Sequence, residues 1–329
     1  MAPGAEGSAR RGNAPPSLRE IVTPGRHLAL VGTTASGKSA LALALARQDP
    51  TVELVSVDSM QVYRGMDIGT AKPTRAEQAE VQHHLIDLVE PDDDYTVARF
   101  ATDVRVVLQD LEQRGRRGVL VGGTGLYARA AVEDVEIPAQ HPHTRAALEL
   151  EADTEVLYAR LLELDPVAAS RMESANRRRV IRALEVTIGS GRPFSSYGPG
   201  LTTYPDSPIQ IVGVRLPRPV IDARVVARYD EQLRDGFVDE VRTLAARPGG
   251  LSRTARQALG YRELLSHTEE RVALDEAVDL AITRTRRFAR RQERWFRRDP
   301  RIRWLQPAAG SGDDPSTILE PLLALFERG

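Results

Sequence analysis

The chain has 329 residues, of which 41% are hydrophobic and 28% are charged, and its formal net charge is -1. This composition is that of a globular protein in water, and no stretch approaches the roughly 18 consecutive apolar residues of a transmembrane helix. Because the chain has no cysteine, disulfide scaffolds and thiolate metal sites such as zinc fingers are excluded. We expect a cytoplasmic protein that does not contact a membrane, and we expect a monomer.

The first 26 residues are rich in Gly, Ala, Pro, Ser and Arg. They contain no apolar segment of the kind that a secretory signal requires. A segment of this composition cannot bury enough apolar surface to fold. We therefore expect residues 1–26 to form a disordered tail outside the fold.

Three short apolar runs follow, and each ends at a polar or glycine-rich turn. They cover residues 27–32, 52–57 and 118–121. Helical patterns lie between them, among them residues 40–47 and 95–114. This alternation predicts an α/β fold in which a parallel sheet is flanked by helices. Ligands of such sheets bind outside the carboxyl ends of the strands, where these three turns would converge.

The pattern changes to charged, Leu-rich helical segments over residues 132–204, which contain no clear buried strand. We expect these residues to form a helical insertion domain. An apolar run at 209–216 and a long amphipathic helix at 218–236 return to the sheet. The remaining predicted elements are helices at 239–246, 261–267 and 274–298, an edge strand at 302–305, and a last helix after the turn-rich residues 310–315.

The sequence thus divides into a discontinuous core and one inserted domain. The predicted core comprises residues 27–131 and 205–308. Residues 309–329 are expected to form a C-terminal linker and helix. No internal repeat is visible, so repeat architectures are not favoured.

A phosphate-binding motif connects the first strand to the helix that follows it. Residues 32–39 read GTTASGKS and fit the P-loop pattern G-x-x-x-x-G-K-[ST]. Successive backbone N–H groups of such a loop point at phosphate oxygens, and the helix N-terminus adds about half a positive charge. Lys38 supplies a full charge, and the Ser39 hydroxyl is the expected ligand of Mg²⁺. The predicted phosphate-binding residues are Gly32, Thr33, Thr34, Ala35, Ser36, Gly37, Lys38 and Ser39.

Asp58 stands at the end of the second apolar run. A carboxylate there can accept a proton or hold a magnesium-bound water, but aspartate is also a common helix cap or turn residue, so both roles stay open. Its surroundings, residues 56–73 (SVDSMQVYRGMDIGTAKP), resemble the signature segment of the tRNA dimethylallyltransferase family, also called tRNA isopentenyltransferases. Further segments resemble this family in the same order, at residues 83–87, 95–100, 122–127, 182–186, 260–263 and 290–296.

The resemblance implies a core similar to that of P-loop kinases, with dimethylallyl diphosphate bound where a kinase binds ATP. It implies transfer of the dimethylallyl group to N6 of the adenosine 3′-adjacent to the anticodon (position 37) in tRNA. An adenine amine is a poor nucleophile, and the resemblance assigns Asp58 as the base that accepts its proton. It also assigns Thr124 and Arg228 to the catalytic site and Arg224 to the donor diphosphate. Mg²⁺ and Lys38 would stabilise the departing diphosphate.

The same resemblance implies that the tRNA anticodon stem-loop is the partner. The target adenosine has to leave the base stack to reach a buried site. Arginines suit both phosphate pairing and stacking on splayed bases, although an isolated arginine such as Arg145 is equally compatible with a solvated side chain. The residues assigned to tRNA contact are Asp58, Ser59, Met60, Gln61, Thr124, Arg145, Arg178, Arg179, Val180, Ile181, Arg182, Gln257, Gly260, Tyr261 and Arg262.

A basic segment near the C-terminus is hidden by the neutral total charge. Residues 284–298 contain eight arginines and one acidic residue. Ala281, Thr285, Phe288 and Trp295 fall on one helical stripe, which we expect to pack on the core. The arginines point elsewhere and are predicted to bind phosphates, with a solvated face as the alternative.

The sequence departs from the family pattern at two places. Thr33 replaces a proline that is common in the family loop, and residues 173–176 (ESAN) lack the usual aspartate before the basic run. Three alternatives stay open: a small-molecule kinase, an RNA-binding module without prenyl transfer, and an enzyme that prenylates free adenine nucleotides. The last should lack the helical insertion.

Overall fold

A six-stranded sheet forms the centre of the protein in the computed structural model, which describes residues 16–198, 200–307 and 314–327. All pairings are parallel, and the strand order is β3-β2-β4-β1-β5-β6. The predicted parallel α/β fold is therefore confirmed. The strands are β1 (Leu28–Gly32), β2 (Val52–Ser56), β3 (His83–His84), β4 (Arg117–Gly122), β5 (Gln210–Val214) and β6 (Arg303–Leu305).

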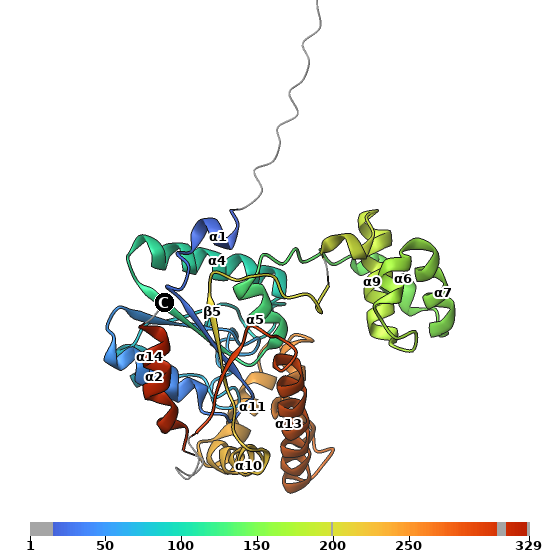
Figure 1. Ribbon diagram of the computed structural model, residues 1–329. Helices are drawn as coiled ribbons and strands as arrows, with labels where there is room; N and C mark the ends of the chain where they lie inside the picture. Colours follow the sequence, from blue (N-terminus) through green and yellow to red (C-terminus); the bar gives the residue numbers. More distant parts are fainter. Residues whose placement is uncertain (1–15, 199, 308–313, 328–329) are drawn as a thin grey trace, which may run out of the picture.

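Helices cover both faces of this sheet, which explains why β1 is a continuous apolar run and why β2, β4 and β5 are mostly apolar. Side chains alternate along β1: Leu28 and Leu30 pack in the cluster under α2 and α14, whereas Ala29 and Val31 pack in the larger cluster on the other face. Figure 1 shows α2 and α14 on one side of the sheet and α4, α5 and α13 on the other. These helices are α2 (Lys38–Gln48), α4 (Val97–Gln113), α5 (Gly125–Val132), α13 (Leu274–Phe296) and α14 (Leu319–Phe326).

The long helix α10 (Arg218–Arg234) packs against α13, and α11 (Phe237–Ala245) and α12 (Tyr261–Thr268) complete that side of the core. These helices and the edge strand β6 confirm the elements predicted for residues 209–305 within a few residues. The last helix is also confirmed, as α14. Most of the predicted linker before it, residues 308–313, lies outside the described residues.

A helical insertion separates α5 from β5, as predicted. Its helices pack around their own core, which includes Leu157, Leu161 and Leu184, and Figure 1 shows them standing apart from the sheet. Val132, where the insertion was expected to begin, is only 3% exposed and ends α5 in the core, so the inserted segment starts after it. The insertion helices are α6 (Pro142–Glu149), α7 (Thr154–Leu164), α8 (Pro166–Ser170) and α9 (Arg177–Ser190).

The segment before β1 belongs to the core, so the prediction of a disordered tail up to residue 26 is wrong for residues 17–26. A short helix, α1 (Leu18–Ile21), packs against α4. Leu18 is fully buried, and its N–H donates to Asp134 Oδ1 at 2.9 Å. The Thr23 N–H donates to Glu112 on α4 at 2.8 Å. One buried leucine outweighed the polar composition around it. Residues 1–15 lie outside the described part of the chain.

Two short elements had no sequence prediction. They are α3 (Arg75–Glu80), which buries no residue, and β3, which has only two residues. Neither provides an apolar run or a helical stripe.

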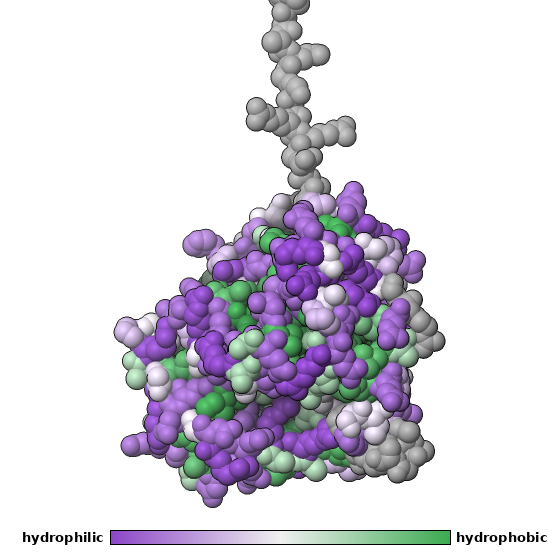
Figure 2. All heavy atoms as spheres, turned by 90° about the vertical axis from the view of Figure 1, so that its left-hand side faces the viewer, coloured by the Kyte–Doolittle hydropathy of each residue, from purple (hydrophilic) through white to green (hydrophobic). Residues whose placement is uncertain are grey.

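Among the described residues, no helix combines the length and apolar character needed to cross a bilayer. On the face shown in Figure 2, hydrophobic residues lie in small groups among hydrophilic ones.

Candidate active site at the carboxyl edge of the sheet

The phosphate-binding motif has the strand, loop and helix context that its sequence predicts. Gly32 ends β1, and α2 begins at Lys38 after Gly37, which is left-handed at φ 86°. A Cβ on Gly32 would lie 2.8 Å from the Val214 carbonyl oxygen of β5, so this position requires glycine. Ala35 is left-handed at φ 62° without being glycine, a conformation that strained functional loops often contain.

Lys38 lies inside the loop, near one cationic residue, Arg228, and one anionic residue, Asp58. Its Nζ donates to the Thr33 carbonyl at 3.2 Å. Burial, and after it the positive charge of Arg228, lower the pKa of Lys38 to about 8, while the negative charge of Asp58 opposes this shift. These electrostatic couplings place all three predicted residues at one site. The P-loop and the end of β2 therefore converge, as expected.

Thr34 is bound on both sides by helices from the C-terminal half of the chain. Its backbone N–H donates to Gln292 Oε1 of α13 at 2.8 Å. Its hydroxyl accepts from Arg228 Nη1 of α10 at 2.9 Å. One of the loop amides predicted to point at phosphate is thus already occupied by a side chain. Burial also lowers the pKa of Arg228, which is nevertheless cationic at neutral pH.

Two serines of the loop differ in exposure. Ser36 is fully buried, and within the described chain its Oγ has no hydrogen-bond partner. Ser39, the predicted magnesium ligand, is exposed in the first turn of α2. No group of three or more His, Cys, Asp or Glu side chains that could hold a metal ion occurs among the residues the structure describes. A metal there would depend on hydroxyl, water and ligand oxygens.

Asp58 follows directly on the pairing of β2 with β4, because the Val57 N–H donates to the Val121 carbonyl at 2.8 Å. The Asp58 carboxylate is half-buried, and Oδ1 accepts the Met60 N–H at 2.8 Å. This local bond fixes the side chain while its second oxygen has no such contact in the described structure. The turn geometry is therefore compatible with a role of Asp58 as a base, which stays a prediction.

Gln61 was predicted to offer hydrogen-bonding groups to a base, but its amide holds the loop itself. Its Oε1 accepts from Ser56 Oγ at 2.8 Å, and its Nε2 donates to the Thr70 and Ala71 carbonyls at 3.3 and 3.2 Å. Both amide hydrogens are therefore used within the loop. Only the remaining lone pair of Oε1 could face a ligand.

The loop after Asp58 is also fixed by a lysine that sequence reasoning missed. The Lys72 ammonium is buried and donates to the Tyr63 carbonyl, Asp67 and Asp87 at 2.7, 2.6 and 2.6 Å. Two carboxylates and a carbonyl satisfy all three of its donors. Its position within the 56–73 signature segment was the available signal.

Thr124 lies at the N-cap of α5, in the turn after β4. The turn packs too closely for side chains at its glycines. A Cβ on Gly122 would lie 2.0 Å from the Val57 carbonyl oxygen, and one on Gly125 would lie 2.3 Å from Trp295 Nε1. The third turn thus meets the Asp58 segment on one side and α13 on the other.

Arg224 and Arg228 lie on one face of α10, four residues apart, and Arg228 is bonded to Thr34 of the P-loop. Hydrogen bonds from Ser316 lower the pKa of Asp314, and the charge of Arg224 contributes to the same shift. Arg224 therefore lies near the C-terminal segment. Its assignment to the donor stays a prediction.

The residues assigned to tRNA divide by exposure. Arg178, Arg179, Gln257 and Arg262 are exposed. Three others have side chains that are not available to tRNA: Val180, Ile181 and Tyr261 are 0%, 3% and 0% exposed. Val180 and Ile181 fill the insertion core, and the Tyr261 hydroxyl donates to Glu240.

The remaining assigned residues have structural contacts of their own. Gly260 is buried at φ 85° and supplies the left-handed turn before α12. Arg145 and Arg182 pair with the buried Glu185 at 3.5 and 2.8 Å. Arg182 also donates to the Pro138 carbonyl at 2.7 Å, which ties α9 to the segment entering the insertion.

Helix α13 separates a buried stripe from an arginine-rich face. Phe288 and Trp295 were expected on the stripe but are only half-buried. The residues of the buried stripe of α13 are Ala277, Ala281, Thr285, Ala289, Gln292 and Phe296. Arg284 pairs with Glu263, and Arg286 pairs with Asp222 at 3.9 Å. The exposed arginines in and just after this helix, called the α13 arginine face below, are Arg287, Arg290, Arg291, Arg294, Arg297 and Arg298.

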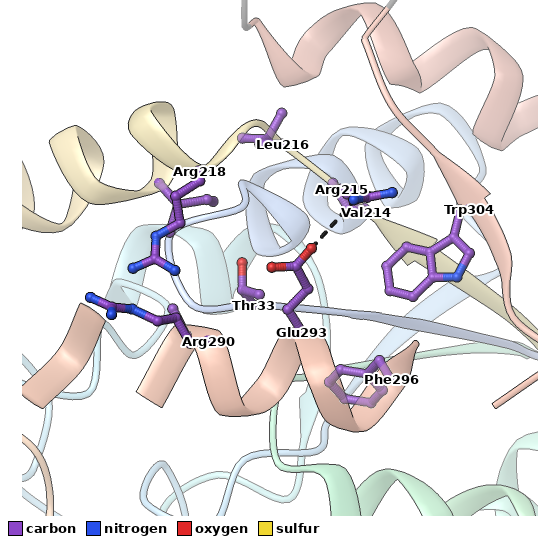
Figure 3. Close-up of a pocket in the computed structure, with 11 residues that line it drawn as sticks. Thr33, Val214, Arg215, Leu216, Arg218, Arg290, Glu293, Phe296 and Trp304 are labelled. Atoms are coloured by element: carbon purple, nitrogen blue, oxygen red, sulfur yellow. Dashed lines mark ion pairs between the residues drawn. The ribbon is translucent and has the colours of Figure 1, made fainter. Parts of the chain in front are cut away.

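A small pocket lies on the β5 side of the loop, across β1 from Asp58 (Figure 3). Thr33 lines it together with Leu216, Phe296 and Trp304. Arg215 and Glu293 pair at its rim, at 3.5 Å. Because Asp58 and Thr124 follow β2 and β4, this pocket is on the other side of the loop from these two residues.

Comparison with known proteins identifies related sequences over nearly the whole chain. A family model described as IPP transferase matches residues 61–299, and one described as isopentenyl transferase matches residues 26–92. The chain is similar to the tRNA dimethylallyltransferase of Kineococcus radiotolerans, with 45% identity over 307 residues that cover 91% of this chain and 96% of that protein. It is 43% identical to the tRNA dimethylallyltransferase of Streptomyces avermitilis, over 96% of this chain and 98% of that protein.

Solved structures agree with this similarity. The tRNA isopentenylpyrophosphate transferase of Bacillus halodurans has 34% identity and a TM-score of 0.65, covering 92% of this chain and 97% of that one. The corresponding structure from Staphylococcus epidermidis has 28% identity and a TM-score of 0.66, covering 92% and 99%. Both alignments span the sheet and the insertion together.

Proposed function

The chain belongs to the IPP transferase family, and we propose on this basis that it transfers a dimethylallyl group from dimethylallyl diphosphate to tRNA. The acceptor in this proposal is N6 of the adenosine 3′-adjacent to the anticodon. The observation that carries the proposal is the convergence of Lys38, Arg228 and Asp58 at the edge of the sheet. A cationic loop for a leaving group beside a carboxylate base is what this substitution requires.

In the proposed reaction, the N6 amine attacks the allylic carbon. A nitrogen–carbon bond forms, the bond from that carbon to the diphosphate oxygen breaks, and diphosphate leaves with the electron pair. The proton of N6 passes to the Asp58 carboxylate. Asp58 is half-buried just after the end of β2, and one of its oxygens is fixed by Met60, so the other is proposed to accept the proton.

The leaving diphosphate is proposed to lie in residues 32–39, which are called the donor loop below. Lys38 and Arg228 would supply positive charge, and the α2 N-terminus adds to it. The buried Ser36 hydroxyl, which has no partner in the described residues, would be satisfied by a phosphate oxygen. The Ser39 hydroxyl suits Mg²⁺, a cation that binds few protein oxygens and keeps phosphate and water ligands. Mg²⁺ would supply further positive charge to the leaving group.

We assign tRNA binding to exposed cationic and polar surfaces. The exposed residues Arg178, Arg179, Gln257 and Arg262 and the α13 arginine face are available for phosphates and unstacked bases. Thr124 lies at the start of α5, in the turn after β4 that meets the donor loop at the carboxyl edge of the sheet. The chain is proposed to act in the cytoplasm, where tRNA is present, and as a monomer, because these site residues all come from one chain.

The experiment that tests the function uses radiolabelled dimethylallyl diphosphate, Mg²⁺ and tRNA that lacks the modification. Label should enter tRNA, and nuclease digestion should recover it in one N6-modified adenosine. Label in AMP but not in tRNA would instead establish prenylation of free nucleotides. Hydrolysis of ATP without transfer of label would establish a kinase-like or ATP-driven activity and overturn the proposal.

A further inference from the structure

Gln292 connects the two turns that carry the site, although it does not reach the site itself. It lies on the buried stripe of α13 and is 6% exposed. Its Oε1 accepts the Thr34 N–H at 2.8 Å, and its Nε2 donates to the Gly123 carbonyl at 2.8 Å. Because one partner can only donate and the other can only accept, a carboxamide is the group that satisfies both.

The two partners of Gln292 belong to two different loops of the proposed active site. Thr34 is in the loop proposed to hold the leaving diphosphate, and Gly123 is next to Thr124 in the turn after β4. There is no room for a side chain at Gly123, between this turn and Gln292. A Cβ on Gly123 would lie 2.4 Å from Gln292 Nε2 and 3.0 Å from the Gly32 carbonyl oxygen. Gln292 therefore rests directly on the backbone of the turn.

The next residues of α13 fix the same turn at a second point. Trp295, one helical turn after Gln292, packs on Gly125, where a Cβ would lie 2.3 Å from its Nε1. The α13 arginine face is on the solvent side of this helix. Helix α13 thus sets the position of the Thr124 turn relative to the donor loop, and Gln292 supplies the polar part of that link.

We propose that Gln292 is a positioning residue that sets the spacing between the donor loop and the Thr124 turn. It thereby aligns the allylic carbon with the attacking amine without touching either substrate. This inference rests on the proposed function. A displacement of about 1 Å at a reacting centre is enough to lower a rate by about a hundredfold.

The test begins with Gln292→Met, which keeps the length of the side chain and removes both hydrogen bonds. With tRNA and donor both saturating, single-turnover transfer should slow by about tenfold to a hundredfold. The KM for dimethylallyl diphosphate should rise, and the Kd for tRNA should stay within about twofold of wild type.

Gln292→Glu adds a readout that a purely structural role would not change. Its carboxyl group, when protonated, can replace both bonds of the amide, whereas the carboxylate repels the Gly123 carbonyl. The rate of Gln292→Glu relative to wild type should therefore rise as the pH is lowered. The same ratio for Gln292→Met should be independent of pH.

Gln232 provides the matched control. It is also 6% exposed, and its Nε2 donates to the Ile68 carbonyl at 2.6 Å, away from the donor loop. Gln232→Met should lower thermal stability as Gln292→Met does, with transfer slowed less than threefold. Equal rate losses for the two variants, or a wild-type rate for Gln292→Met, would overturn the inference. If wild-type protein itself transfers no label to tRNA, the proposed function fails instead.

Discussion

Arg228 of α10 donates from Nη1 to the Thr34 hydroxyl of the donor loop at 2.9 Å, across 194 residues of sequence. The bond holds a half-buried guanidinium against the loop. The loop therefore does not depend on the helix N-terminus and Lys38 alone for its positive charge. A diphosphate entering it would meet two cations that already have a fixed position.

Removal of Arg228 should damage catalysis more than removal of its partner. We expect Arg228→Ala to lower kcat/KM for the donor by about a hundredfold or more, because a half-buried cation beside the leaving group is lost. Thr34→Val should cost less than tenfold, since the cation remains. Steady-state kinetics of both single variants and of the double variant would show non-additive losses; full additivity would contradict a coupled pair.

Asp58→Asn should separate chemistry from binding. The amide keeps an oxygen that can accept the Met60 N–H, so the loop should retain its conformation, but it cannot take the proton of N6. We expect turnover to fall by about 10²- to 10⁴-fold with little change in the Kd for tRNA. Asp94→Asn, at an exposed acidic position, is the control. Wild-type turnover in Asp58→Asn would remove this residue from the mechanism.

Donor binding should weaken as the pH rises through the pKa of Lys38, which burial lowers to about 8. Above that pH the free enzyme has a neutral lysine, and binding of an anion has to recover the proton. Titration calorimetry with dimethylallyl diphosphate should show proton uptake and a Kd that increases by up to about tenfold per pH unit above the pKa. In Lys38→Arg the side chain stays charged, so the Kd should lose this dependence. A flat profile for wild type would contradict the assignment.

The α13 arginine face should contribute to tRNA affinity through its charge. Arg291→Ala combined with Arg294→Ala should weaken binding and reduce the salt dependence of log Kd by about one to two phosphate contacts. The control removes the same charge at the opposite edge of the sheet, through Arg47→Ala and Arg116→Ala. Filter binding over a range of salt concentrations measures both. Identical slopes in the two double variants would indicate a solvated face.

The N-terminal segment should contribute to global stability. Leu18 is fully buried in the main core, so Leu18→Ala should lower the free energy of unfolding by about 2–5 kcal/mol. Leu150→Ala removes the same group from an insertion residue that is 87% exposed and should cost less than about 0.5 kcal/mol. Denaturant unfolding checks both. Equal stabilities would mean that α1 does not belong to the cooperative core.

The parts of the fold that were predictable are those whose physical cause is local. The strands β1, β2 and β4 lie in the interior of the sheet, so each is rich in apolar residues up to the turn at its end. The P-loop motif then placed its lysine and serine. In contrast, β3 has two residues and α3 buries none, so neither leaves a pattern.

The features that the sequence did not reveal depend on distant packing. The role of Leu18 is decided by α4 and Asp134, far along the chain. Val180 and Ile181 were grouped with the arginines beside them, although their apolar side chains at adjacent positions are typical of a core-facing helix side. Gln292 lies in the family-like segment 290–296, but its bonds could not be predicted because its partners are 258 and 169 residues away.

The bond between Thr34 and Gln292 also has a consequence for synthesis of the protein. The donor loop leaves the ribosome early, but one of its amides has no bonding partner until α13 has emerged, 258 residues later. The insertion, which has a core of its own, is translated in between. A nascent chain that stops before α13 therefore lacks the partner of this loop amide, so such incomplete products of translation would be unable to modify RNA.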